Sequence, residues 1–394
     1  MRPPPTDQPA RRLRRILSLD DFEHAARRHL PGPIFAYVIG GAETNQSLRD
    51  NREAFTEYGF VPRVLVGVTG RSSQTELFDT RWSHPFGIAP MGITALTAYR
   101  GDLALARAAA RAGIPMIVSG ASLIRLEDII AVNPDAWFQA YLPGDPARTE
   151  ALIERVAKAG YRTLVITVDT PVSANRENNV RAGFSTPLRP SLRLAWDGIT
   201  HPRWLIGTFA RTLARHGMPH FENSYATRGA PILSPDAVRD NSDRGYMDWR
   251  LFERVRKLWK GRIVVKGVMD ARDAVLARDL GAEGLIVSNH GGRQLDGSVS
   301  PLRVLPAVVA ACPDIPVMMD SGIRRGTDAL KAMALGARFV FVGRPFNFAG
   351  AIAGEAGVDH AIRLLGSEIA RDMALLGVNR VEQLRPEMLM RTRN

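Results

Sequence analysis

Cysteine is almost absent from this sequence: Cys312 stands alone among 394 residues. A single cysteine excludes an intramolecular disulfide and a cysteine-rich metal site. Long apolar runs are missing too, since no stretch approaches the roughly 18 apolar residues that a spanning helix requires. The arginine-rich start, from Arg11 to Arg15, is followed by polar residues rather than a long apolar stretch, which matches a secretion signal poorly. We therefore expect a cytoplasmic protein.

Lysine is also scarce, supplying 5 of the 52 basic residues, and the formal net charge is +12. Such a charge suggests nucleic acid or an anionic membrane surface as a partner. The arginines are scattered, however, without a basic run beside aromatic residues and without a helix-turn-helix or zinc pattern. We therefore predict no nucleic-acid binding. The composition, with 45% hydrophobic and 23% charged residues, is that of a globular protein.

Short apolar runs alternate with helical patterns along most of the chain. The eight runs predicted as strands cover residues 86–90, 114–118, 137–141, 163–168, 262–265, 284–287, 315–319 and 337–342. The predicted helices between them cover residues 102–112, 125–132, 146–159, 271–280, 302–311 and 327–335. Continuous apolar strands separated by helices indicate a parallel sheet covered on both faces, and eight such units are typical of a closed barrel. A Rossmann fold is disfavoured because no G-x-G-x-x-G segment opens a helix.

The predicted fold is an α/β TIM barrel, (β/α)8, over residues 81–384. A helical cap is expected over residues 1–80 and a tail over residues 385–394. Residues 187–249 interrupt the barrel after its fourth strand and show no clean period. Catalytic groups of such barrels lie at the carboxyl ends of the strands, so the polar residues at these ends are the candidate site.

The sixth strand is followed by Ser288-Asn-His290-Gly-Gly-Arg293-Gln-Leu-Asp296. His290 stands where a general base would act near neutral pH, and Arg293 can hold a carboxylate through two parallel hydrogen bonds. The alternative is a surface loop that needed its two glycines for turns.

The fourth strand leads to Asp169 and then Arg176. Asp169 can orient an imidazole and raise its pKa, and Arg176 can be a second carboxylate clamp. The alternative is a capped strand end followed by a solvated arginine. Lys266 follows three β-branched residues of the fifth strand, and a buried ammonium requires an anion beside it. The alternative is a lysine just past the strand, in solvent.

The last two strands end in glycine and arginine, the composition of a phosphate cradle in barrels of this type. The alternative is a pair of ordinary turns. The cradle residues are Asp320, Gly322, Arg324, Gly343 and Arg344, while Ser119, Gln139 and Thr167 end the second to fourth strands and could line a flat polar heterocycle.

Together these segments resemble the FMN-dependent L-2-hydroxy acid oxidising family, which includes glycolate oxidase, lactate oxidase, flavocytochrome b2 and mandelate dehydrogenase. The resemblance covers about residues 19–384. The segments that carry it are Leu30-Pro31 to Glu43, Phe138-Gln-Ala-Tyr141, Thr167-Val-Asp-Thr-Pro171, Val265-Lys-Gly267, Ser288 to Asp296, and Asp320 to Gly326.

The resemblance implies that FMN is the cofactor and that no metal is needed. It implies that Tyr37, Tyr141, Arg176 and Arg293 hold the substrate, and that His290, supported by Asp169, takes its proton. It places Pro90, Met91 and Gly92 against the flavin ring; Ser119, Gln139, Thr167 and Lys266 at its polar edge; Ser288 within the FMN site; Asp320 and Arg324 on the ribityl chain; and Gly322, Gly343 and Arg344 on the phosphate. Gly92 and Ala121 are small and leave room for a ring on the substrate.

Gly92 and the insertion both favour a dehydrogenase. Family dehydrogenases coupled to quinone have glycine at the position of Gly92, whereas the oxidases more often have alanine. Residues 195–204 and 215–219 resemble the membrane-docking segment of these dehydrogenases. Residues 187–220 hold five arginines against one acid, Asp197. A lid packed on the barrel or on a neighbouring subunit is the alternative for this segment.

The sequence thus predicts oxidation of an L-2-hydroxy acid, with mandelate as the first choice and lactate as the second. Electrons are expected to pass to a membrane quinone, with the enzyme a homotetramer on the inner face of the plasma membrane. An oxygen-using oxidase that makes hydrogen peroxide stays open, and so does a flavin-dependent isomerase. Whether the substrate's electrons leave as hydride or through a carbanion is left open as well.

Overall fold

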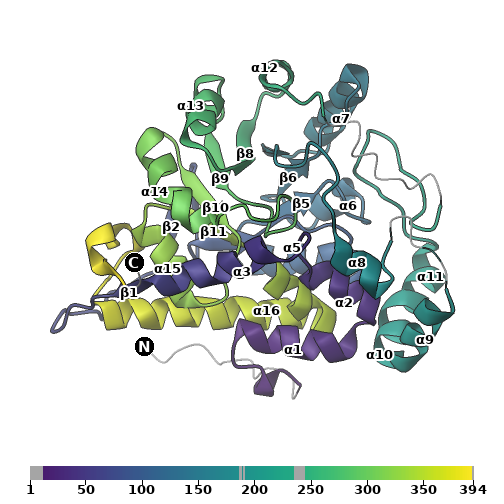
Figure 1. Ribbon diagram of the computed structural model, residues 1–394, viewed down its shortest axis with the longest axis horizontal. Helices are drawn as coiled ribbons and strands as arrows, with labels where there is room; N and C mark the ends of the chain where they lie inside the picture. The colour runs from purple at the N-terminus through teal and green to yellow at the C-terminus, as the bar shows by residue number, and fades with distance from the viewer. Residues whose placement is uncertain (1–11, 186–188, 190, 235–244, 393–394) are drawn as a thin grey trace.

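The computed structural model describes residues 12–185, 189, 191–234 and 245–392, and a sheet of eight parallel strands forms its centre (Figure 1). Arg11 and parts of the expected insertion, namely residues 187, 188, 190 and 235–244, lie outside the described residues. The strands are β4 (Phe86–Ile88), β5 (Ile117–Ser119), β6 (Trp137–Ala140), β7 (Thr163–Thr167), β8 (Arg262–Val268), β9 (Gly284–Val287), β10 (Val317–Asp320) and β11 (Phe339–Val342).

These strands confirm the predicted barrel. Their order is β4-β11-β10-β9-β8-β7-β6-β5, and a parallel bridge between Ile88 and Met116 joins the two ends of the sheet. The barrel is therefore nearly closed. β5 and β10 begin two or three residues later than predicted because Pro115 and Pro316 have no N–H to donate to the ladder.

Alternate side chains of the strands fill the interior of the barrel. Ile117, Trp137, Val165, Val264, Ile286, Met318 and Phe339 form one buried cluster. The hairpin of β2 (Thr75–Leu77) and β3 (Thr80–Trp82) adds Leu77 and Trp82 to the same cluster. The hairpin thus closes the amino-terminal end of the barrel, and an open space can form only at the opposite end.

Helices cover the outside of the barrel. The six predicted helices are confirmed as α5 (Gly101–Ala112), α6 (Leu126–Ile130), α7 (Pro146–Lys158), α13 (Ala271–Asp279), α14 (Pro301–Ala311) and α15 (Gly326–Ala334). Apart from the helices of the insertion, described below, the helices that were not predicted are α4 (Thr94–Thr97), α8 (Glu177–Ala182), α12 (Trp249–Leu258) and α16 (Arg344–Leu376). α16 bends where Ala353 and Gly354 leave helical geometry, which obscures one continuous helical period in the sequence.

The N-terminal region contains η1 (Leu13–Arg15), α1 (Leu19–His29), α2 (Gly32–Ile39), α3 (Gln46–Glu53) and η2 (Ala54–Glu57). Ser18 caps α1 reciprocally with Asp21. After these helices the chain forms β1 (Tyr58–Phe60), which pairs antiparallel with β12 (Leu389–Arg391), preceded by the 3-10 turns η6 (Val381–Gln383) and η7 (Pro386–Met388). The expected tail therefore contributes a strand, and the region before residue 80 is not wholly helical. The domain boundaries at residues 80 and 384 stay predictions.

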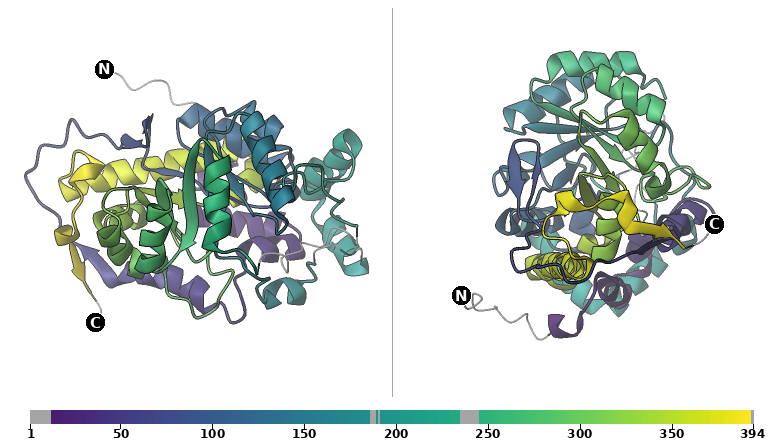
Figure 2. Two further views of the ribbon diagram at one scale, coloured as in Figure 1. Left: turned by 90° about the horizontal axis from the view of Figure 1, so that it is seen from above. Right: turned by 90° about the vertical axis from the view of Figure 1, so that its left-hand side faces the viewer.

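The described part of the insertion is helical, although its sequence showed no clean period. We call α9 (Leu192–Thr200), α10 (Pro202–Trp204), the π-helical η3 (Leu205–Ala210) and α11 (Arg211–His216) the insertion helices. They project from one side of the barrel (Figure 2). The buried Trp204 holds them there, since its Nε1 donates to the carbonyl of Leu96 at 2.7 Å. Within the described residues, no helix has both the length and the apolar character needed to cross a membrane.

Candidate active site

Because side chains alternate in direction along each strand, the strands that place apolar side chains in the barrel also place polar ones there. Each lies two residues after a core side chain and therefore points the same way. The resulting layer of buried polar residues consists of Ser119, Gln139, Thr167, Lys266, Ser288 and Asp320. One end of the barrel is thus apolar and packed, and the other is polar.

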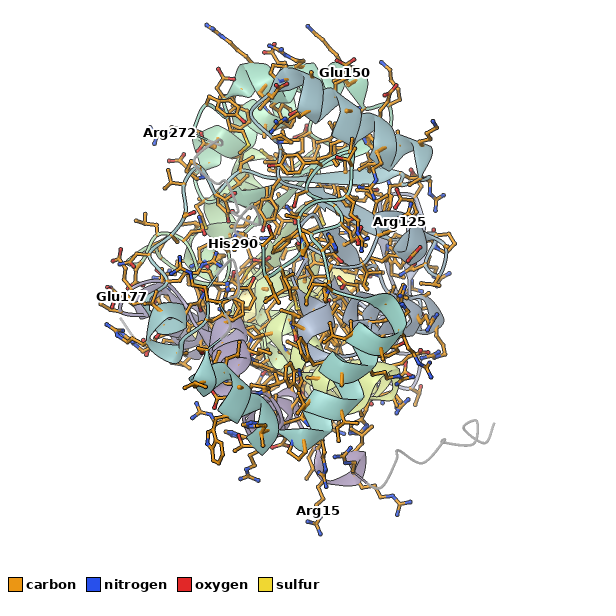
Figure 3. The ribbon with its side chains drawn as sticks, turned by 90° about the vertical axis from the view of Figure 1, so that its right-hand side faces the viewer. Arg15, Arg125, Glu150, Glu177, Arg272 and His290 are labelled. Carbon is orange, nitrogen blue, oxygen red and sulfur yellow. The ribbon has the colours of Figure 1, made fainter. Side chains whose placement is uncertain are left out.

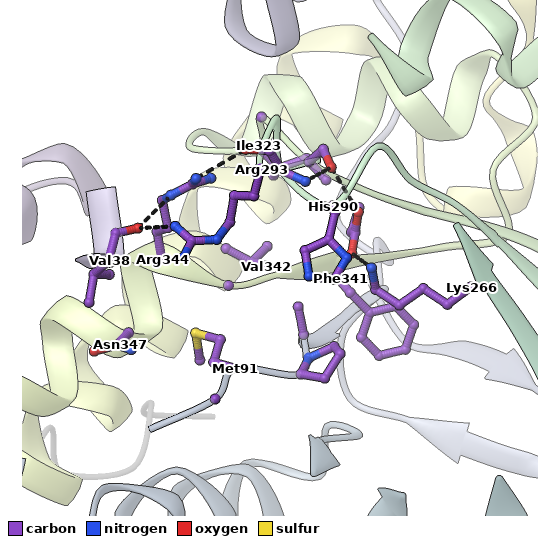
Figure 4. Close-up of a pocket in the computed structure, with 18 of the residues that line it drawn as sticks. Val38, Met91, Lys266, His290, Arg293, Ile323, Phe341, Val342, Arg344 and Asn347 are labelled. Atoms are coloured by element: carbon purple, nitrogen blue, oxygen red, sulfur yellow. Dashed lines mark hydrogen bonds and ion pairs between the residues drawn. The ribbon is translucent and has the colours of Figure 1, made fainter. Parts of the chain in front are cut away.

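Above this polar layer lies a cavity that is open to solvent. Fifteen of the twenty predicted site residues line it: Tyr37, Pro90, Met91, Gly92, Tyr141, Thr167, Arg176, Lys266, His290, Arg293, Asp320, Gly322, Arg324, Gly343 and Arg344. The other five do not line it: Asp169 pairs with His290, and Ser119, Ala121, Gln139 and Ser288 are buried. Side chains from α2, the strand ends and the start of α16 therefore converge on one space (Figure 4).

His290 is paired with Asp169 through its Nδ1, which lies 2.8 Å from Oδ1 of the carboxylate. His290 has a left-handed backbone with φ of 57°, and Gly291 and Gly292 continue this conformation. The loop therefore turns sharply and directs the imidazole at Asp169. Gly267 makes the pairing possible, because a Cβ there would lie 2.7 Å from Cβ and Cγ of Asp169.

Burial sets the protonation of this pair. It lowers the pKa of His290 below its usual value, although Asp169 acts in the opposite direction. Burial alone would raise the pKa of Asp169, but His290 and Lys266 outweigh it and the pKa lies below its usual value. The pair is therefore a neutral imidazole and an ionised carboxylate near pH 7. Nδ1 donates to Asp169, which leaves Nε2 as the basic nitrogen.

Lys266 supplies a buried positive charge beside this pair. Its Nζ lies 3.0 Å from Oδ2 of Asp320 and donates to Oγ of Ser288 at 2.9 Å. Burial disfavours the ammonium, but Asp320 and Asp169 outweigh it and raise the pKa of Lys266. The prediction that Lys266 faces an anion is thus matched by a carboxylate of the protein itself.

Arg176 and Arg293 line the same wall of the cavity. Arg293 donates through Nη1 to the carbonyls of Tyr37 at 2.8 Å and Gly40 at 2.7 Å, and its guanidinium lies 5.0 Å from the centre of the Tyr37 ring. Arg176 donates through Nη2 to Oε1 of Gln294 at 3.1 Å. The guanidinium of Arg293 is therefore anchored to the backbone at the end of α2, and that of Arg176 to the loop that carries His290.

Arg344 and Arg324 add further positive charge to the cavity, and Arg344 lies on the opposite side from Lys266 (Figure 4). Arg344 donates to the carbonyls of Val38 at 2.9 Å and Gly291 at 3.0 Å. Burial, followed by repulsion from Arg293 and Arg324, lowers the pKa of Arg344 well below its usual value. A guanidinium stays protonated in proteins, so this part of the site favours an anion.

The sequence did not predict several residues of the site. Ser321 accepts a hydrogen bond from the N–H of Gly291 at 3.0 Å and donates to Oδ1 of Asp320 at 2.8 Å. The signal in the sequence that could have identified Ser321 was its position between two predicted site residues, Asp320 and Gly322. Asn347 lines the cavity one helical turn after Gly343, in a helix that was not predicted. The other missed lining residues are Val38, Ala89, Gly291, Ile323, Phe341 and Val342.

The site fits the polar and anionic parts of FMN. Among the described residues, Nε2 of Gln139 and Oδ1 of Asn347 are buried without a hydrogen-bond partner. A polar ring edge or chain would satisfy such groups. Arg324, Arg344 and the glycine turns at Gly322 and Gly343 provide the donor set of a phosphate site. Within the described residues, no cluster of three His, Cys, Asp or Glu side chains could hold a metal ion.

This barrel, with a neutral imidazole, four arginines and two glycine turns around one cavity, has the composition expected of an FMN-dependent oxidoreductase. Residues 26–391 match the family described as FMN-dependent dehydrogenase, and the chain belongs to that family. This confirms the resemblance found in the sequence and FMN as the cofactor.

The relatives span almost the whole chain. The chain is 36% identical to (S)-mandelate dehydrogenase of Pseudomonas putida over 375 residues, covering 95% of this chain and 94% of the relative. It is 39% identical to an L-lactate dehydrogenase of Pseudomonas entomophila strain L48 over 381 residues, covering 95% and 98%. The crystal structure of the monotopic membrane protein (S)-mandelate dehydrogenase superposes with a TM-score of 0.90 at 36% identity, covering 96% of this chain and 100% of that one.

Proposed function

We propose that this enzyme oxidises an (S)-2-hydroxy acid to the 2-oxo acid. The observation that carries the proposal is the 2.8 Å pairing of His290 with Asp169 beside a cavity that Arg176 and Arg293 also line. A base and two guanidinium groups suit a substrate that carries a hydroxyl and a carboxylate on adjacent carbons. FMN-dependent isomerisation would not need this combination.

In this proposal, Arg176 and Arg293 hold the carboxylate while Tyr37 and Tyr141 complete the pocket around the hydroxyl. Nε2 of His290 accepts a proton from the hydroxyl or the α-carbon. Asp169, already ionised, stabilises the imidazolium that forms. The substrate loses two electrons and two protons in total.

FMN, when bound, supplies the two-electron acceptor for this oxidation. Ser119, Gln139, Thr167 and Lys266 would hold the polar edge of its ring near Ser288, with Pro90, Met91 and Gly92 against the ring. Asp320 and Arg324 would hold the ribityl chain, and Gly322, Gly343 and Arg344 the phosphate. The buried ammonium of Lys266 would favour negative charge at that edge.

We place mandelate first and lactate second as substrates. The names of the relatives support this choice, as does Gly92, which lines the cavity without a side chain. Ala121 is only 3% exposed, and its carbonyl accepts from the N–H of Ile93 at 3.1 Å. Its effect on the substrate side chain would thus pass through the 90–94 loop.

We further propose that the acceptor is a membrane quinone and that the insertion helices bind an anionic membrane surface. Leu192, Trp196, Ile199 and Ile206 are between 61% and 92% exposed on these helices. Exposed apolar side chains next to arginines are typical of an interfacial segment. A peripheral location on the inner face of the plasma membrane and a homotetramer complete the proposal.

Anaerobic addition of (S)-mandelate or (S)-lactate to the FMN-loaded enzyme tests the reaction. We expect the flavin absorbance band to bleach with the (S) enantiomer. An unchanged band with every 2-hydroxy acid tried would overturn the proposal. Admitting air then tests the acceptor: slow reoxidation fits a dehydrogenase, and reoxidation at many turnovers per second identifies an oxidase.

A further inference from the structure

A second cleft lies apart from the catalytic cavity, where the N-terminal helices meet the insertion helices. Its volume is about 370 Å³. It is lined by the two residues that flank η1, by α1, by the junction of α9 with α10, and by Ile352 of α16. In Figure 3, Arg15 marks the N-terminal segment below the insertion helices.

Positive charge dominates the rim of this cleft. Arg12, Arg28 and Arg203 are exposed, and among the described residues none of them forms an ion pair with a carboxylate. Other arginines of the chain differ in this respect; Arg303, for example, pairs with both Asp50 and Glu57. Within the described part of the protein, no carboxylate therefore lies at ion-pair distance from these three arginines.

The charges are close enough to act on one another. Burial first, and then repulsion from Arg12, His201 and Arg203, lowers the pKa of His29. His201 is held in place by its Nδ1, which donates to the carbonyl of Asp197 at 2.7 Å. Like charges gathered in one cleft create a local potential that an anion would relieve.

The rear wall of the cleft is apolar. Ile16 is buried, and its carbonyl accepts a hydrogen bond from Nε2 of His360 at 2.9 Å. Ala25 and Ile352 complete the wall. A ligand that combines an anionic group with an apolar part would therefore match both the rim and the wall.

We propose that this cleft binds the phosphate of an anionic phospholipid headgroup, with Arg12, Arg28 and Arg203 around the phosphate and the glycerol backbone against Ile16 and Ile352. A lipid is favoured over soluble phosphate because the cleft adjoins helices that expose Trp196 and Ile199. The inference rests on the membrane association proposed above, and adds to it a defined headgroup site.

Vesicle sedimentation tests the proposal with the FMN-loaded enzyme. The probes are vesicles of phosphatidylcholine with or without phosphatidylglycerol, at equal total lipid. The variant is Arg28→Gln/Arg203→Gln, with Arg28→Glu alone as a second variant. The matched control is Arg250→Gln/Arg254→Gln, which removes two exposed arginines from α12 on another part of the molecule. Substrate-driven bleaching of the flavin verifies that each protein is folded.

We expect the cleft variant to partition onto phosphatidylglycerol vesicles about tenfold less than the wild type or lower, since each arginine near an anionic surface contributes about a fivefold factor. The control should change about twofold or less, because its charges are screened from the surface. Equal partitioning of the cleft variant and the wild type would overturn the headgroup site alone. If instead the wild-type protein does not bind vesicles that contain phosphatidylglycerol, the membrane association itself is overturned.

Soluble phosphates test whether the anion that the cleft binds is a lipid headgroup or a free phosphate. Inorganic phosphate and glycerol phosphate, at the same ionic strength as a chloride control, should release little protein from the vesicles. If either compound raises the unfolding temperature of the wild type but not of the cleft variant, while vesicle binding is equal in both, the site belongs to a soluble phosphate and the proposal is wrong.

Discussion

His290 combines three properties that a base needs at neutral pH: a neutral state, a fixed tautomer and a place on the cavity wall. Its Nδ1 is held by Asp169 at 2.8 Å, so Nε2 is the nitrogen that is left to accept the proton. We expect His290→Gln to retain FMN and to lower kcat by about 10²–10⁴-fold, the usual contribution of a general base. Flavin absorbance and stopped-flow bleaching measure the two quantities. His24→Gln, at an exposed position of α1, is the control, and near wild-type turnover in His290→Gln would remove this residue from the mechanism.

The pH dependence of kcat/KM follows from the same residue. The base acts when neutral, so the rate falls as the pH drops through the pKa of His290, which burial places below the usual value of a histidine. In Asp169→Asn the carboxylate that raises this pKa is lost. We expect the acidic limb to move to lower pH and the plateau to fall roughly 10²-fold or more, because the imidazolium loses its partner. A limb that moves to higher pH would contradict this assignment.

Lys266 and Asp320 form a buried pair whose partners depend on one another. Removing the cation in Lys266→Met leaves the carboxylate buried and unpaired, which costs about 3–5 kcal/mol of stability. We expect Lys266→Met/Asp320→Asn to recover much of this loss in urea unfolding without recovering FMN content. Lys257→Met, at an exposed position of α12, is the control. A double variant as unstable as the single one would show that the two charges do not compensate each other.

At the scale of elements, the insertion helices divide their side chains between the barrel and solvent. Trp204 is buried and bonded to Leu96, whereas Trp196 is 66% and Ile206 69% exposed. If the exposed face enters a membrane interface, Trp196→Ser/Ile206→Ser should reduce vesicle binding about tenfold or more, since each buried side chain contributes about 1.5–3 kcal/mol. Bleaching by substrate in solution should stay the same.

The control for this prediction is Val64→Ser/Leu65→Ser, which removes two exposed apolar side chains from the loop after β1. A loss of substrate affinity in the insertion variant, with vesicle binding intact, would favour the alternative that these helices form a lid.

At the scale of the whole molecule, the net charge of +12 adds a long-range attraction to anionic surfaces. Salt screens that attraction but not the burial of apolar side chains. We expect binding to phosphatidylglycerol vesicles to fall steeply between about 0.05 M and 0.5 M NaCl and to level off above zero, as the Debye length shrinks well below about 10 Å. Binding that does not respond to salt would show that charge has no part in it.

The barrel was predictable because its strands are continuous apolar runs of the length that buried parallel strands require. Most of the catalytic residues were predictable for a related reason: they stand where those runs end, and the ends of parallel strands meet at one edge. His290, Asp169 and Lys266 were placed in this way. Asn347 was not, because it lies in α16, whose bend at Ala353 and Gly354 interrupts the helical period.

By itself the sequence determined the eight strands of the barrel, the six helices predicted between them and the polar residues at the strand ends, since these depend on local composition and spacing. Its motifs carried the resemblance to the family. Only the tertiary structure decided which distant groups share a space. β12 pairs with β1, and Arg12 and Arg28 join Arg203 around one cleft. Such contacts arise from how the chain closes on itself, and no local pattern of residues encodes that closure.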